Sequence, residues 1–387
     1  MTRSRWTARR MIAMLLTAAV WAATGAGTYL YIGSHRGTIA AQARTPGEAR
    51  SGSSSPLSRL PGTMYIVQQG TLYRLQGGAF TALLQSATWT QPAVAPSGQS
   101  LLVVRRDYDF SDLYLVDTAG HVQAQLTHDA NRNVQLNHWA FYPRFSADGG
   151  QVFFSYDAKD RFNSYDVVLS IYQMPVRGSF GQARKWTTPE PYTGGDLQPI
   201  PLGPLGVIYT KYTFDQATNR ILSQVWLTPR IGAVGRPLTD AAADCSQPSL
   251  APDGRRLALI CTGGTQFASV EVASFDGASL GPRQVLVGGQ LAAQPTWAPD
   301  DSGLVYLAPQ GLSGHFELWF QPLPPPPPPT PTAVPANSPT PRRAGAARPT
   351  ATPSPPTPSP SPPRPPAAIQ LTTDLDFDAT STIAWHL

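Results

Sequence analysis

Few side chains in this sequence have the spacing that catalysis or metal binding requires. The six histidines are scattered, and no two of them stand at the spacing of metal ligands. The sequence contains no Gly-x-Ser-x-Gly nucleophile motif and no glycine-rich phosphate-binding loop. Asp374, Asp376 and Asp378 begin like a calcium-binding loop, but its glycine at the sixth position and its glutamate at the twelfth, here Trp385, are missing. We therefore predict no catalytic residue, no metal and no cofactor, and a solvated loop at these aspartates.

The two cysteines, Cys245 and Cys261, are the remaining candidates for covalent chemistry. Pro252-Asp253-Gly254 between them predicts a tight turn, because proline presets φ, aspartate bonds to the nearby backbone and glycine accepts a positive φ. Each cysteine is eight residues from Asp253, and residues equidistant from a hairpin turn face each other across antiparallel strands. We predict a disulfide between them. The alternative is two small buried side chains, since a one-residue bulge would turn one cysteine to the opposite face.

The turn between the cysteines belongs to a repeat. Each copy opens with a proline, and these prolines stand at positions 92, 143, 199, 248 and 295, at intervals of 51, 56, 49 and 47 residues. A short first strand holds the proline, and a turn, an apolar second strand, a third strand and a fourth strand that often closes on Leu-Thr follow. The second strands are apolar at successive positions, as in strands buried on both faces. Four strands per repeat without helical periodicity predict the blades of a β-propeller.

The repeat also resembles that of a known family. The pattern Pro-x-(Trp/Phe/Leu)-(Ala/Ser)-Pro-Asp-Gly, the apolar strand, the tyrosine-containing third strand and the closing Leu-Thr-x-Asp resemble the repeats of TolB-like propellers, which are relatives of WD-type repeats. The resemblance covers residues 62–321 and 367–387. It implies the propeller fold but leaves the function open, because such repeats occur in binding scaffolds, in the propeller halves of serine peptidases and in a few lyases.

A proline-rich tract interrupts the last repeat. Residues 322–366 contain 21 of the 41 prolines of the chain. A sheet cannot use so many residues without an N–H group, so we predict a disordered or polyproline II loop. The 21 residues beyond it are too few to fold alone, but they contain a closing fourth strand at Ile369–Thr372 and an opening first strand at Thr382–Trp385. The sequence therefore predicts an all-β, six-bladed propeller whose C-terminal strand completes the first blade in a Velcro closure.

The N-terminal residues predict one transmembrane helix. Residues 1–10 form a basic cytoplasmic tail with four arginines and no acid, and residues 11–33 contain no charged residue. The second segment is long enough to span the bilayer as a signal-anchor, with the propeller on the extracytoplasmic side. Residues 34–61 are polar enough to form a flexible linker, and the propeller occupies residues 62–387. A cleaved signal peptide and a buried core helix are the alternatives for the apolar segment.

The positive charge of the chain lies in its tails. The net charge is +5, but residues 1–61 carry eight arginines and one glutamate and the proline-rich tract carries four arginines, so the folded core has a net charge of −6. Such a core offers no basic surface to nucleic acid. The tail arginines orient the membrane span and keep the linkers solvated. The alternative is that these arginines attract the tails to anionic lipid or to a cell-wall polymer.

Aromatic side chains are the remaining candidates for ligand binding. The first strands of a propeller line its central channel, and five aromatic residues lie in or beside first strands: Trp139, Tyr142, Phe145, Trp297 and Trp385. They form a possible channel-lining ligand platform, and packing between blades is the alternative.

We therefore expect a membrane-anchored, extracytoplasmic propeller that acts as a non-catalytic recognition module for an envelope protein, a peptide or a glycan. The first alternative is a lyase or hydrolase working in the channel mouth. The second is a structural protein of the cell envelope whose proline-rich loop contacts the cell wall. The enzyme requires titratable groups that converge at one channel mouth, whereas the binding scaffold requires an apolar or mixed patch without them.

Overall fold

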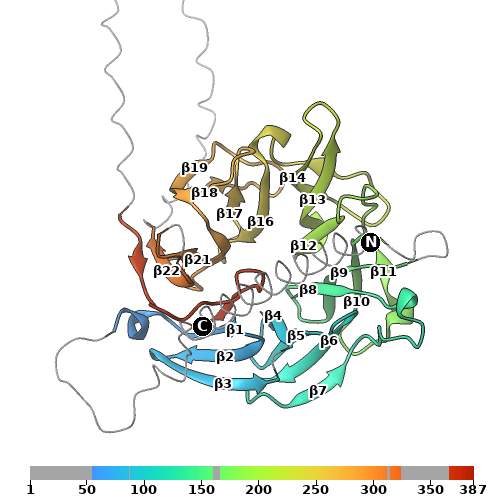
Figure 1. Cartoon of the computed structure of the whole chain (residues 1–387), viewed down its shortest axis with the longest axis horizontal. Helices are drawn as coiled ribbons and strands as arrows, with labels where there is room; N and C mark the ends of the chain where they lie inside the picture. Colours follow the sequence, from blue (N-terminus) through green and yellow to red (C-terminus); the bar gives the residue numbers. More distant parts are fainter. Residues whose placement is uncertain (1–54, 87, 160–165, 312–313, 324–365) are drawn as a thin grey trace, which may run out of the picture.

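In the computed structural model, six four-stranded antiparallel sheets follow one another around a ring (Figure 1). The structure describes residues 55–86, 88–159, 166–311, 314–323 and 366–387. Each sheet is one blade, so the predicted all-β, six-bladed propeller is confirmed. None of the helices in these ranges is long and apolar enough to cross a membrane. The predicted anchor at residues 11–33 and its cytoplasmic tail lie outside the described residues, as do most of the linker and of the proline-rich tract.

Four blades are built from strands that are consecutive in the chain. The second blade contains β4 (Trp89–Val94), β5 (Ser100–Arg106), β6 (Ser111–Asp117) and β7 (Val122–Gln125). The third contains β8 (Ala140–Phe145), β9 (Gln151–Tyr156), β10 (Ser170–Pro175) and β11 (Arg184–Lys185). The fourth contains β12 (Asp196–Pro201), β13 (Val207–Asp215), β14 (Arg220–Thr228) and β15 (Arg236–Pro237). The fifth contains β16 (Cys245–Leu250), β17 (Arg256–Cys261), β18 (Ala268–Ser274) and β19 (Gln284–Gln290).

The C-terminal residues complete the other two blades. The first blade has the order β24 (Ala384–His386), β1 (Thr63–Gln68), β2 (Thr71–Gln76) and β3 (Ala79–Gln85). The sixth contains β20 (Ala293–Trp297), β21 (Gly303–Pro309), β22 (Phe316–Pro322) and β23 (Ile369–Gln370). Met64 of β1 pairs with Trp385 of β24, and Phe320 of β22 pairs with Ile369 of β23. The ring is therefore closed by pairing between the two ends of the propeller, as the sequence predicts.

Short 3₁₀ helices occur in the connections. They are η1 (Pro56–Arg59), η2 (Val134–Leu136), η3 (Phe180–Gln182), η4 (Gly203–Leu205) and η5 (Ala241–Ala243). The first of them precedes β1, and its Leu57 is 7% exposed and packs into the core between blades 1 and 6. Packed structure therefore begins a few residues before position 62.

The hydrophobic core lies between the blades. Leu101–Val104 of β5 and Leu304–Ala308 of β21 are almost completely buried, because a second strand packs against neighbouring blades on both faces. One cluster of buried apolar side chains lies at each contact between adjacent blades. Complete burial of one leucine or valine side chain stabilises the fold by about 1.5–3 kcal/mol. The successive apolar positions of the second strands thus explain how the blades stack.

A β-bulge recurs in the first strand of five blades. The residue before the repeat proline has φ between 52° and 58°, and the pairing with the second strand shifts there. A left-handed conformation costs a non-glycine residue about 1–3 kcal/mol. Hydrogen bonds between blades offset part of this cost: Gln91 Oε1 accepts the N–H of Tyr142 at 2.7 Å, Gln198 Oε1 that of Gln247 at 3.1 Å, and Gln247 Oε1 that of Gln294 at 2.6 Å. The Gln-Pro pair of the repeat therefore links neighbouring blades at the channel wall.

The closing Leu-Thr pair of the repeat has a structural role as well. Its threonine hydroxyl accepts a backbone N–H of the third strand: Thr127 from Leu113 at 3.0 Å, Thr239 from Val225 at 3.0 Å, and Thr372 from Leu318 at 2.9 Å. These buried bonds fix the short fourth strand to the outer edge of its blade.

The two cysteines lie opposite each other in the fifth blade. Cys245 of β16 pairs with Cys261 of β17, their Cα atoms are 4.0 Å apart, and their sulfur atoms are bonded at 2.11 Å. The bulge at Gln247 aligns them, because without the register shift Cys261 would face Ser246. The bulge therefore brings the two cysteines to facing positions, whereas the alternative drawn from the sequence has a bulge turn one of them to the opposite face.

The segment from Asp374 to Asp378 is not the solvated loop that its aspartates predict. Leu375 and Phe377 are 1% and 2% exposed and belong to the cluster between blades 1 and 6. The N–H of Leu375 donates to Oε1 of the buried Glu317 at 2.9 Å. The segment alternates polar and apolar residues, and its apolar positions face the core.

Candidate functional site

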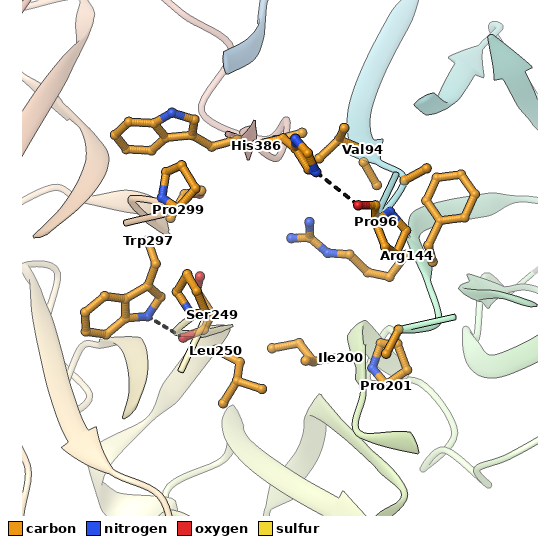
Figure 2. A pocket seen from close by; sticks show the side chains of 18 of the residues that line it. Val94, Pro96, Arg144, Ile200, Pro201, Ser249, Leu250, Trp297, Pro299 and His386 are labelled. Carbon is orange, nitrogen blue, oxygen red and sulfur yellow. Dashed lines mark hydrogen bonds between the residues drawn. The ribbon is translucent and has the colours of Figure 1, made fainter. Parts of the chain in front are cut away.

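A cavity of about 500 Å³ lies at one mouth of the central channel (Figure 2). It lies where the first strands end and turn into the second strands, and residues of all six blades line it. Proline rings and apolar side chains make up most of its wall: Val94, Pro96, Ile200, Pro201, Pro248, Leu250, Pro252 and Pro299. Several of these prolines belong to the turn signals of the repeat, so the repeat itself builds the rim of the cavity.

Equivalent residues of the six blades form a ring inside this cavity. The residue that follows the repeat proline, or Ile383 in the first blade, lines the cavity in every blade: Ala93, Arg144, Ile200, Ser249, Thr296 and Ala384. Because the bulge precedes this position in five blades, the backbone presents the same position to the channel each time. Five of the six side chains carry no charge, and Arg144 is the exception.

Arg144 extends from β8 into the middle of the cavity (Figure 2). Within the described ranges its guanidinium group has neither a hydrogen-bond acceptor nor a carboxylate partner, and no Asp or Glu lines the cavity. Burial lowers the pKa of Arg144 to about 10, so the side chain remains a cation at neutral pH. The cavity thus combines apolar walls with one partly buried positive charge.

His386 is the other ionisable side chain in the wall. Its Nε2 lies 3.1 Å from the carbonyl oxygen of Pro96, and its Nδ1 lies 2.6 Å from the main-chain oxygen of Leu387. Both ring nitrogens therefore lie near main-chain oxygen atoms.

Three of the predicted platform residues line this cavity, namely Phe145, Trp297 and Trp385. Trp297 is 4% exposed, its Nε1 donates to Ser249 O at 2.9 Å, and the guanidinium carbon of Arg256 lies 4.5 Å from the centre of its ring. Trp385 is 9% exposed and donates to Pro61 O at 2.7 Å. The indole rings pack between blades, and little of either ring is available to a ligand.

The other two predicted platform residues lie toward the opposite mouth, where the first strands begin. Tyr142 lines a second cavity of about 450 Å³ there, together with Arg106 and Asp378. Trp139 stacks on Phe141 with ring centres 5.6 Å apart, and Arg106 lies 6.0 Å from the Trp139 ring. Burial raises the pKa of Tyr142 to about 12, so its hydroxyl stays protonated. The structure therefore divides the five aromatic residues between two mouths.

Strongly shifted carboxyl groups occur away from the channel, between blades 2 and 3. Burial raises the pKa of Asp129 to about 7 and that of Asp157 to about 6. Asp129 Oδ1 accepts the hydroxyl of Tyr156 at 2.9 Å, and its N–H donates to Asp112 Oδ1 at 2.8 Å. Asp112 Oδ1 also accepts the hydroxyl of Thr127, and that hydroxyl oxygen accepts the N–H of Leu113 in β6. Asp112 and Asp129 therefore belong to the hydrogen-bond network that holds the strands of the blade together. The described residues contain no cluster of three His, Cys, Asp or Glu side chains arranged to hold a metal ion.

An alignment of the repeats points to Arg144, although a search for aromatic residues does not find it. The arginine is the single charged residue at the position after the repeat proline. Whether that position faces the channel depends on the bulge before it, and the sequence does not state the direction of the side chain.

The six blades around a central channel form a six-bladed β-propeller, and a solved TolB structure shares this fold. TolB from Acinetobacter baumannii superposes with a TM-score of 0.52 at 18% identity, over 68% of this chain and 61% of that protein. A putative TolB from Agrobacterium tumefaciens gives 0.47 at 16%, over 68% and 86%. A puromycin-hydrolyzing peptidase from Mycobacterium tuberculosis gives 0.43 at 16%, over 69% and 46%. The chain thus spans less than two thirds of the first TolB, and no family model and no curated protein matches its sequence.

Proposed function

We propose that this chain is a non-catalytic binding module whose ligand is a short extended segment of a peptide or protein. The observation that carries the proposal is the cavity of about 500 Å³ at the channel mouth, with its wall of proline rings and aliphatic side chains. Such concave, mainly apolar surfaces with few polar groups are typical of binding sites. The cavity also lies on rigid strands, which favours a ligand that adapts to the protein.

The covered tryptophan rings favour a peptide over a glycan. Sugar rings stack on open aromatic faces, whereas Trp297 lies under Arg256 and Trp385 is buried between blades 1 and 6. A peptide needs only apolar contacts for its side chains and a few polar groups for its backbone, and Ser249 and Thr296 supply hydroxyl groups in the wall. A channel-mouth lyase or hydrolase finds less support, because Arg144 and His386 are the ionisable side chains of the described lining.

The proposal places the module outside the cytoplasm on an anchor at residues 11–33. The bonded pair Cys245 and Cys261 supports an oxidising compartment, because disulfides persist there and are rare in the cytosol. Fractionation of cells tests this part. The full chain is expected with the membranes, and a soluble secreted form that starts near Gly27 would indicate cleavage instead.

A cavity-filling substitution tests the binding site. The full chain is used to select binders from displayed random peptides, and their affinity is measured by fluorescence anisotropy. Ser249→Trp is expected to abolish binding, since the new indole would occupy the channel from a position equivalent to Arg144. Gln216→Trp is the matched control, because Gln216 is exposed in the turn between β13 and β14. The proposal fails if no peptide is selected, or if Ser249→Trp binds as the wild type does while it melts at the same temperature.

A further inference from the structure

Arg144 differs from the structural arginines of this propeller. Arg256 has two carboxylate neighbours, Asp301 at 2.9 Å and Asp253 at 3.3 Å, in addition to the Trp297 ring. Arg283 pairs with Glu271 at 2.9 Å. A guanidinium group has five N–H donors in a planar fork, and those of Arg144 have no acceptor among the described residues of the protein.

The position of Arg144 is fixed by its strand. The pairing of β8 with β9 shifts between Phe141 and Arg144, at the bulge of Tyr142, and then continues with Arg144 opposite Phe153. The N–H of Tyr142 is held by Gln91 of the preceding blade at 2.7 Å. The backbone that carries the arginine is therefore tied to two neighbouring strands, which fixes the point from which its side chain enters the cavity.

The surroundings of Arg144 favour a carboxylate as its partner. Apolar walls lower the local dielectric, and a charge pair is stronger there than in water. A carboxylate matches the planar fork of the guanidinium group with two parallel hydrogen bonds. Arg144 is the one lysine or arginine of the described lining, so one negative group is sufficient to pair with it.

The rim of the cavity disfavours ligands with several negative charges. Asp148, Asp253 and Asp300 lie in the turns at the rim, next in sequence to the lining residues Ala147, Pro252 and Pro299. Asp148 is exposed, and its hydrogen bonds with Ser146 and Gly150 hold its pKa below the usual range. A polyanion would meet these three carboxylates, of which Asp253 is paired with Arg256, whereas a single carboxylate flanked by apolar residues meets less repulsion.

We propose that the ligand of the channel mouth presents one carboxylate, from an acidic side chain or from a peptide C-terminus, to the guanidinium group of Arg144. The proposal rests on the binding role proposed above and adds the chemical group that determines specificity. Arg144 is the specificity-determining residue, and the proline and aliphatic walls contact the apolar neighbours of the acid.

The test compares matched peptides on the full chain. Each peptide selected by the wild type is synthesised with its acidic residues kept or replaced by the amide, and with its C-terminus free or amidated. The wild type is expected to bind the form with the required carboxylate about 10- to 100-fold more tightly than its neutral counterpart, the range expected for a desolvated charge-assisted hydrogen-bonded pair. Arg144→Gln is expected to bind both forms equally, and Arg144→Lys to keep part of the preference. Arg132→Gln, at an exposed position outside the cavity, is the matched control and should behave as the wild type.

The outcomes separate this inference from the proposed function. If peptides bind and Ser249→Trp blocks them, but Arg144→Gln keeps the same preference as the wild type, the carboxylate assignment is wrong and the binding module stands. If no peptide binds, both fail together. The free and amidated forms distinguish a C-terminal carboxylate from a side-chain carboxylate. Competition by inorganic phosphate at a lower concentration than acetate would overturn the carboxylate in favour of a phosphate ligand.

Discussion

Asp129 provides a quantitative test of the packing between blades 2 and 3. The residue follows β7, is 4% exposed, and lies in a cavity lined also by His128, His138 and Lys159. Burial raises its pKa from the ordinary value of 3.8 to about 7, and the Asp112 carboxylate adds to the increase. The hydroxyl of Tyr156, which donates to Asp129 Oδ1, opposes it. The substitution Asp129→Asn removes this ionisation and keeps an oxygen for Tyr156.

The sign of the effect follows from proton binding. Between pH 4 and pH 7 the folded protein retains a proton on Asp129 that the unfolded chain has released, so the free energy of unfolding falls as the pH rises through this window. One pKa unit corresponds to 1.36 kcal/mol, and the shift to about 7 therefore predicts a loss of about 3 kcal/mol between pH 5 and pH 8. Asp157, whose pKa is raised to about 6, adds a smaller loss that remains in the variant.

The assay is denaturant unfolding of the full chain at pH 5 and pH 8, in which the measured quantity is the difference between the two free energies. Asp129→Asn is expected to reduce this difference by about 3 kcal/mol. A change in stability that is the same at both pH values reflects packing and does not enter the comparison. Asp240→Asn is the control, because Asp240 is exposed in the corresponding connection of the fourth blade. Equal pH dependence in Asp129→Asn and the wild type would refute the assignment of the buried carboxyl group.

Two further predictions concern closure of the chain. Cys245→Ser should lower the free energy of unfolding by about 2–3 kcal/mol, as expected for the short loop of this disulfide. Mass spectrometry of the wild type after alkylation without reduction should find no modified cysteine. Two alkylated thiols would contradict the bond. Truncation after Pro366 should remove β23 and β24 and with them one strand from each of two blades, so that the ring unfolds; an unchanged melting temperature would contradict the closure.

Much of the fold is predictable because each repeat carries its own turn and strand signals. The repeat prolines and the final Thr382–Trp385 segment are sufficient to predict six blades and the pairing of β24 with β1. Equal distances to Asp253 predict the disulfide, although the register that aligns the cysteines depends on the bulge at Gln247. In that case a local irregularity and a simple count lead to the same pair.

The site is less predictable, because it depends on side-chain direction. The aromatic residues near the first strands are predicted as ligand contacts from their type alone, but the rings of Trp297 and Trp385 extend between blades. Arg144 faces the channel because the backbone reverses its usual hand at Tyr142, and no propensity of tyrosine before proline indicates this. The aspartates on either side of Leu375 and Phe377 favour a solvated loop, but the alternation of polar and apolar residues in this segment is consistent with the burial of these two side chains.

The participation of β24 in the cavity has a consequence for how the protein matures. Ala384, Trp385 and His386 form one side of the channel mouth, and the same residues close the ring by pairing with β1. An open ring, such as that of a chain still being synthesised, lacks this side and has an incomplete cavity. If the proposed binding role holds, a ligand in the mouth would bind the closed ring only, and its concentration would set how strongly closure is favoured. Ligand binding at the mouth and closure of the ring would then be thermodynamically linked.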